Sequence, residues 1–217
     1  MIARQSHNGE RGFSMVELAV VTIIICTIAA IAVVKLQPAL QQSQAAAGKD
    51  QVKSALRQAR ETAISQRRTI VVKFVATANG TPCPIAPGIF NCVELFQVAV
   101  SGTPPVAVVA ANPFLTLPIE NNVQFMTLVG ETDLPAPDGV GLPTAPAGTS
   151  FPGAVGNMQF QSDGSFTDSN GTPRSGTIFL AVSGMSSTES AVAVMGNTGR
   201  IRSYHGNGSS PTGWVLQ

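Results

Sequence analysis

The sequence predicts an α+β protein in which one long N-terminal helix packs on an antiparallel β body. Three observations lead to this prediction. Residues 13–34 form an apolar run, residues 35–68 are rich in helix-forming residues, and from Thr69 onward short β-branched and aromatic segments alternate with Gly, Pro and Asn. A helical region followed by a series of strands is typical of the α+β class.

The composition of the whole chain limits the range of functions. It has 217 residues with 13 basic and 12 acidic side chains, and 44% of its residues are hydrophobic. Its length fits one domain with an appended segment, and its hydrophobic content fits a packed core. A net charge of +1 argues against a chain that binds nucleic acid or anionic membrane over its whole surface. Three Cys are too few for a disulfide-dense miniprotein.

The first element is an apolar segment long enough to cross a bilayer as a helix. Glu17 is its only charged residue, and residues 18–34 carry no charge. Residues 13–34 would cover roughly 33 Å as a helix, which matches the hydrocarbon core of a membrane. Arg4 and Arg11 precede the segment, so we expect the N-terminal end to remain in the cytoplasm.

Three interpretations of this segment are open. A secretory signal peptide would be cut at the Ala-Ile-Ala of residues 30–32 and release a secreted β-domain enzyme, but its apolar stretch would be unusually long. A plain membrane anchor explains the length but leaves Glu17 unexplained, because a carboxylate in hydrocarbon is unfavourable. The third interpretation explains both the length and the carboxylate.

Residues 12–18 (GFSMVEL) resemble the class III signal of type IV pilins and type II secretion pseudopilins. The resemblance implies that a prepilin peptidase cuts between Gly12 and Phe13 and methylates the new N-terminus at Phe13. It also implies that Glu17 pairs with the N-terminal amine of a neighbouring subunit, which would neutralise a buried carboxylate during assembly. The implied partners are other pilins or pseudopilins in a filament.

Residues 35–68 are expected to continue the helix to about Ser65. Apolar residues recur at spacings of four, three and four along one face, which forms a narrow stripe suited to packing on a sheet: Val52, Leu56, Ala59 and Ala63. Pro38 and Gly48 predict a helix that is continuous but bent.

The same segment carries a net charge of +5, from seven basic and two acidic side chains. Four of the basic side chains lie on one flank beside the apolar stripe: Lys49, Lys53, Arg57 and Arg60. This flank is either an ordinary solvated helix face or a contact strip for acidic neighbours in a filament, for nucleic acid or for lipid phosphates.

The β body is predicted from alternating apolar residues between turn signals. Tight turns are expected at residues 162–165 and 196–199, and the Pro/Gly-rich residues 130–157 are expected to form a long surface loop. Asp138, Asp163 and Asp168 are expected to form local hydrogen bonds in turns. The predicted strands are Thr69–Thr77, Cys92–Ser101, Val106–Ala111, Asn122–Val129, Met158–Gln161, Gly176–Ser183, Ser190–Met195 and Arg200–Tyr204.

The order of the C-terminal segments FQSDGSFT, GTIFLAV and GRIR resembles the GspH/FimT group of minor pseudopilins and minor pilins. The resemblance implies a non-enzymatic subunit of a type II secretion pseudopilus, with a single span in the inner membrane and a periplasmic C-terminal body. Secreted cargo is a further candidate partner. The implied division is a leader at 1–12, a transmembrane helix at 13–34, an amphipathic periplasmic helix at 35–68 and a β-rich domain at 69–217 with its loop at 130–157.

An alternative function within this resemblance is that of a minor type IV pilin that binds DNA for uptake. FimT-type pilins are thought to grip DNA through a G-R-x-R element, which matches residues 199–202. Arg200 and Arg202 are two residues apart, so they would share one face of a strand and could contact adjacent phosphates. Residues 69–217, however, hold four basic and eight acidic side chains, and this negative charge opposes DNA binding.

Other chemistry has little support in the sequence. His205 is a lone histidine in a glycine-rich tail, and no nucleophile elbow, zinc-protease motif or phosphate-binding loop is present, so we expect no catalytic residues, metal or cofactor. Cys83 and Cys92 flank a short Pro/Gly loop. In an oxidising periplasm they would form a disulfide, and the alternative is two buried thiols.

Overall fold

The computed structural model describes residues 14–75, 91–101, 106–119, 123–127, 132–142, 148–151, 158–207 and 213–217. Its first element, α1, is a single helix of 52 residues from Met15 to Gln66 that includes Pro38, so the prediction of one continuous helix is confirmed. The chain divides into two units. One ends at Leu40, and the other comprises Gln41–Gln217.

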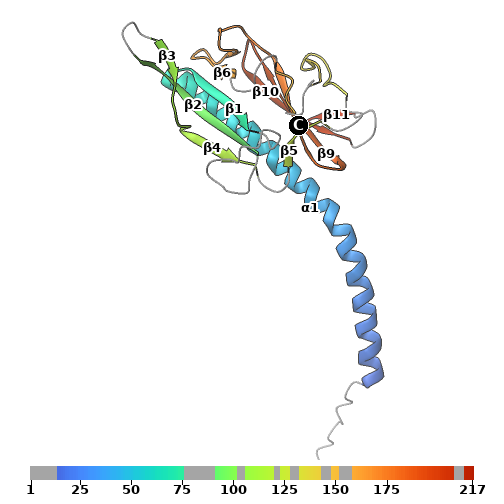
Figure 1. Ribbon diagram of the computed structural model, residues 1–217. Coiled ribbons are helices and arrows are strands. Elements are labelled where there is room, and N and C mark those ends of the chain that lie inside the picture. The colour runs from blue at the N-terminus through green and yellow to red at the C-terminus, as the bar shows by residue number, and fades with distance from the viewer. Residues whose placement is uncertain are drawn as a thin grey trace, which may run out of the picture. The chain divides into compact units, whose positions relative to one another are not determined.

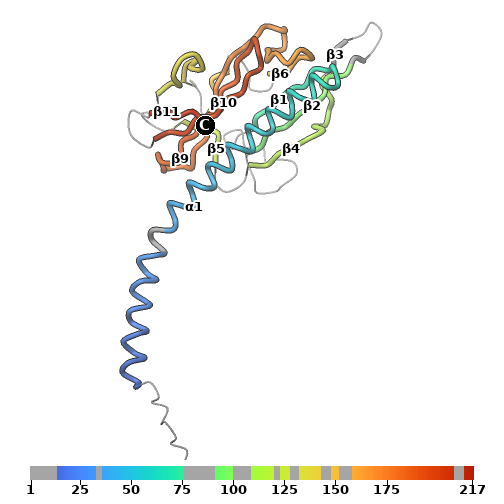
Figure 2. Tube along the Cα trace, turned by 180° about the vertical axis from the view of Figure 1, so that it is seen from behind, coloured from blue at the N-terminus to red at the C-terminus, as the bar shows by residue number. Residues whose placement is uncertain are grey.

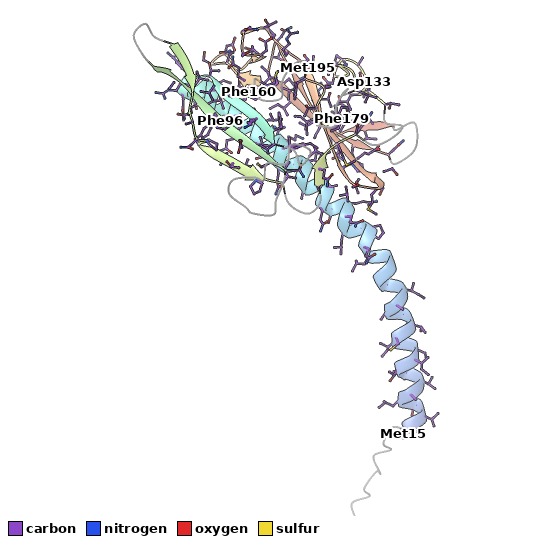
Figure 3. All side chains as sticks on the ribbon, in the orientation of Figure 1. Met15, Phe96, Asp133, Phe160, Phe179 and Met195 are labelled. Atoms are coloured by element: carbon purple, nitrogen blue, oxygen red, sulfur yellow. The ribbon has the colours of Figure 1, made fainter. Side chains whose placement is uncertain are left out.

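Within the N-terminal unit, the described residues from Met15 to Ile31 form an apolar stretch of helix with exposed side chains. The large apolar residues from Met15 to Ile31 are between 47% and 90% exposed, and an 18-residue window of α1 has a mean hydropathy of 2.7. Figure 3 shows their side chains projecting on several sides of the ribbon, beginning at Met15. Thr22 and Thr27 donate hydroxyl hydrogen bonds to carbonyl groups of the helix itself. By length and composition this stretch is compatible with a single-pass membrane anchor.

The second unit contains two antiparallel sheets, which Figure 1 shows with their labels. The six-stranded sheet has the order β3-β2-β1-β6-β7, with β4 paired to the first half of β2. Its strands are β1 (Ile70–Val75), β2 (Cys92–Ser101), β3 (Val106–Val109), β4 (Leu115–Pro118), β6 (Met158–Phe160) and β7 (Phe166–Thr167). The five-stranded sheet has the order β11-β10-β9-β8-β5. Its strands are β5 (Val123–Phe125), β8 (Gly176–Val182), β9 (Met185–Met195), β10 (Arg200–Gly206) and β11 (Trp214–Leu216).

The eight predicted strands are present, and the α+β class is confirmed. The bounds of β2 agree with the prediction, whereas β9 begins at Met185, five residues before the expected start. The prediction missed β4, β7 and β11, because each has two to four residues and is too short for an alternating pattern to be recognised.

The C-terminal part of α1 and both sheets share one hydrophobic core. The predicted apolar stripe is confirmed, since all four of its side chains are fully buried. Around it lie Phe74 and Phe160 of the six-stranded sheet and Ile178 and Val192 of the five-stranded sheet. Figures 1 and 2 show this end of α1, in cyan, lying along β1 and β2. Gly48 allows close packing, because a Cβ there would lie 3.1 Å from the Val123 side chain of β5.

The opposite face of the five-stranded sheet is covered by residues 132–142. Leu134 packs there with Phe179, Tyr204 and two alanines of β9, and Trp214 borders this second cluster. With both faces covered, β8 is buried at every position. The expectation of a surface loop over residues 130–157 is therefore wrong for parts of it, because Leu134 and Asp138 are buried against the sheet and Phe151 is buried in the shared core.

Candidate functional site

The predicted processing site lies just outside the part of the chain that the structure describes. Gly12 and Phe13 lie outside the described residues, so cleavage and methylation there stay predictions. Glu17 is exposed in the first turn of α1. A carboxylate at this position is favoured by the partial positive charge of the helix N-terminus, and it remains accessible to a cationic group from another molecule.

A second candidate site lies where β10 faces the segment 132–142. Arg200, Arg202 and Tyr204 alternate along β10, so their side chains share one face of the strand. All three donate to the carboxylate of Asp138, which is 1% exposed. Arg200 Nη2 lies 2.8 Å from Asp138 Oδ1, whereas Arg202 Nη1 and Tyr204 Oη lie 3.2 Å and 2.5 Å from Oδ2. We refer to these four residues as the Asp138 cluster.

The electrostatics of the Asp138 cluster keep the carboxylate ionised. Burial alone would raise the pKa of Asp138, but the hydrogen bonds from Tyr204 and Arg200 and the charges of Arg202 and Arg200 together hold that pKa below its ordinary value. Burial and the hydrogen bond to Asp138 raise the pKa of Tyr204. At neutral pH the cluster therefore contains one carboxylate, two guanidinium groups and a neutral phenol.

The three turn aspartates, which were predicted to share a local role, differ in their partners. Asp163 accepts from the Ser165 amide at 2.8 Å, and Asp168 accepts from the amides of Asn170 and Thr172, so local bonding is confirmed for both. For Asp138 the prediction is wrong, because its partners are 62 to 66 residues away in the sequence. No signal in the residues around Asp138 identifies these partners.

The basic flank of α1 divides into two halves with different roles. Lys49 is buried and donates to the side-chain oxygen of Gln217, and Lys53 Nζ lies 2.7 Å from Ser203 Oγ. These two lysines attach α1 to β10 and to the residue that follows β11. Lys49 therefore makes a structural contact and does not belong to a solvated face, and burial lowers its pKa.

The other half of the flank borders a surface pocket of about 430 Å³. Arg60 connects α1 to two turns at the border of the pocket. Its Nε lies 3.2 Å from the Gly164 carbonyl oxygen, and its Nη2 lies 3.2 Å from the Thr198 carbonyl oxygen. The pocket is lined by Arg57, Arg60, Glu61, Thr198, Gly199, Arg200 and Ile201. We call it the arginine pocket. The three arginines are candidate contact residues in two separate segments of the sequence, and the fold brings them together.

The remaining predicted sites have no additional support. Cys92 is buried in β2, and Cys83 lies outside the described residues, so their disulfide stays a prediction. Within the described part of the chain, no group of three His, Cys, Asp or Glu side chains could hold a metal ion. His205 is partly buried on β10, and burial together with the charge of Lys49 lowers its pKa.

Comparison with known proteins gives a small number of matches. No protein-family model and no curated protein matches the sequence. Among solved structures, the chain is similar to the type IV minor pilin FimU of Pseudomonas aeruginosa in two crystal forms. In the first, the identity is 16%, the TM-score is 0.43, and the match covers 81% of this chain and 95% of the crystallised chain. In the second, the identity is 16%, the TM-score is 0.41, and the match covers 76% of this chain and 95% of the crystallised chain.

Proposed function

We propose that this protein is a minor pseudopilin, a structural subunit of a type II secretion pseudopilus. A prepilin peptidase removes residues 1–12 and methylates Phe13. The apolar part of α1 holds the subunit in the inner membrane, and the β body lies in the periplasm. During assembly, Glu17 pairs with the N-terminal amine of an adjoining subunit, while the apolar helices pack side by side.

The observation that carries this proposal is the division of α1 into two parts with opposite environments. From Met15 to Ile31 its apolar side chains are exposed and interrupted by one carboxylate near the start, and from Ala45 its apolar stripe is buried in the β body. Exposed apolar surface of this extent requires either lipid or other helices around it. A carboxylate that enters such surroundings requires a cationic partner, which a freed N-terminal amine supplies.

The alternative function of DNA uptake through Arg200 and Arg202 has less support. Both guanidinium groups already pair with Asp138, so a phosphate would have to compete with a buried carboxylate at 2.8 Å and 3.2 Å. The eight acidic side chains in residues 69–217 add long-range repulsion.

The test uses the full chain in a host that has a prepilin peptidase and a filament system. Mass spectrometry of the N-terminus is expected to find methylated Phe13. Glu17→Ala is expected to be processed normally but to enter filaments at a level lowered by about tenfold or more, because it removes the partner of the N-terminal amine.

The matched control is Asp50→Ala, which removes a second exposed carboxylate from the same helix. It is expected to enter filaments like the unchanged protein. Equal incorporation of Glu17→Ala and Asp50→Ala would remove the charge-pairing role, and a mature N-terminus at Val33 would favour a secreted protein instead.

A further inference from the structure

The arginine pocket has hydrogen-bond donors that the fold does not use. A guanidinium group carries five N–H donors. Arg60 directs two of them to carbonyl oxygens, and Arg200 directs one Nη group to Asp138. Arg57 is exposed and makes no hydrogen bond or ion pair with any residue that the structure describes. Several N–H groups on three arginines are therefore available at a single concave surface.

The position of Arg60 is set by two turns with glycine at the point of contact. Gly164 and Gly199 have φ of +83° and +59°, a backbone region that favours glycine. A Cβ on Gly199 would collide with the Gly164 carbonyl oxygen and lie 2.9 Å from Arg60 Nε. These turns thus approach α1 closely enough to hold the guanidinium in place. A preformed donor group loses less conformational freedom when it binds a ligand.

We propose that the arginine pocket binds a carboxylate side chain from an acidic segment of a neighbouring subunit. This proposal rests on the filament function, because it requires an adjoining protein in a fixed position. The arginine fork is well matched to a carboxylate, which can accept two parallel N–H bonds. With Arg57, Arg60 and Arg200 opposed by Glu61, the pocket lining has a net charge of +2, which suits one or two carboxylates.

The charge distribution of the chain favours a protein carboxylate over nucleic acid. A DNA duplex carries a charge about every 1.7 Å and would extend beyond the pocket over an acidic body. A carboxylate side chain needs only the pocket itself. Asp133 and Asp163 are exposed on this body, so a neighbour with a body like this one offers carboxylates to a basic helix segment.

The experiment measures binding of a fluorescent hexaglutamate peptide to the full chain in zwitterionic detergent micelles, by anisotropy at low salt. Arg57→Gln is the test variant, because Arg57 is exposed and has no described hydrogen bond or ion pair, so we expect its loss to leave the fold unchanged. It is expected to weaken binding by about five- to tenfold, the loss of one charge-assisted contact at a partly exposed site. The matched control, Arg68→Gln, removes an exposed arginine outside the pocket and is expected to change the Kd by less than about twofold.

The other outcomes overturn the proposal. Equal weakening by Arg57→Gln and Arg68→Gln would mean attraction to a diffuse basic surface, and absence of peptide binding would leave the pocket without this ligand. Binding of a thymidine oligonucleotide that is tighter than peptide binding and lost in Arg57→Gln would assign the pocket to nucleic acid.

Peptide binding needs no filament, so it is read separately from incorporation of Glu17→Ala. If that variant enters filaments normally, the filament proposal fails while the pocket measurement stands.

Discussion

Asp138→Asn is expected to weaken the attachment of residues 132–142 to the five-stranded sheet. The substitution keeps the size of the side chain but removes its charge and replaces one acceptor oxygen with a donor nitrogen. In the unchanged protein the two oxygens accept from Arg200, Arg202 and Tyr204. An amide can retain the donors of one oxygen, so one or two of the three hydrogen bonds are lost.

The expected loss of stability depends on the number of hydrogen bonds lost and on the exposure of the two arginine side chains to water. A hydrogen bond to a charged group contributes about 1.5–3 kcal/mol when it is protected from water. The Arg200 and Arg202 side chains are 42% and 34% exposed, so water compensates for part of the loss. We expect the free energy of unfolding to fall by about 2 kcal/mol, which lowers the urea midpoint by about 1 M for a typical m-value.

Trp214 provides the assay, because it is the only tryptophan in the sequence and its Nε1 donates to the Thr132 carbonyl at 2.8 Å. Its fluorescence in urea titrations of the full chain in micelles reports the attachment of this segment. Glu61→Gln is the control, since this exposed carboxylate has no described ion pair or hydrogen bond. If Asp138→Asn and Glu61→Gln have the same urea midpoint and the same emission maximum as the unchanged protein, the Asp138 cluster does not hold the segment.

The pH dependence of urea unfolding tests whether the charge of the Asp138 carboxylate contributes to stability. Because the folded-state pKa of Asp138 is lowered, the unfolded chain binds a proton more readily, and stability rises with pH in that range. The contribution is complete above the ordinary carboxyl pKa of about 3.9 and is lost as the pH falls through the lowered folded value. Asp138→Asn is expected to flatten this part of the stability curve.

Three further predictions concern the core, a turn and a histidine. Leu56→Ala leaves a cavity in the shared core and should lower the free energy of unfolding by about 2–5 kcal/mol in urea titrations, against less than about 1 kcal/mol for the exposed Ile64→Ala. Gly199→Ala should cost about 1–3 kcal/mol more than Gly171→Ala, because both have positive φ but only Gly199 is crowded by neighbouring atoms. Because the pKa of His205 is lowered, its contribution to stability is complete above about pH 6.5 and declines below it, so the urea midpoint should fall on acidification, and less so in His205→Asn.

Elements with a local pattern could be predicted from the sequence. The spacing of Val52, Leu56, Ala59 and Ala63 requires a helix to place them on one face, and all four are buried. The bounds of β2 follow from a continuous run of strand-forming residues between turn signals. The apolar run and its single carboxylate are likewise local features of the sequence. The helix could therefore be predicted without knowledge of the tertiary structure.

The arrangement of the charged side chains depended on the tertiary structure. Arg200 and Arg202 have the same spacing whether they face solvent, DNA or a carboxylate, and only the approach of residues 132–142 assigns them to Asp138. Lys49 has the sequence context of a solvated residue, yet it is buried beside Gln217, which lies 168 residues further along the chain. An ion pair or hydrogen bond between residues so far apart in the sequence forms only when the fold has brought their backbones together. Helical and strand periodicity therefore determined the secondary-structure elements. Packing between distant segments determined which charged side chains remain available for a partner.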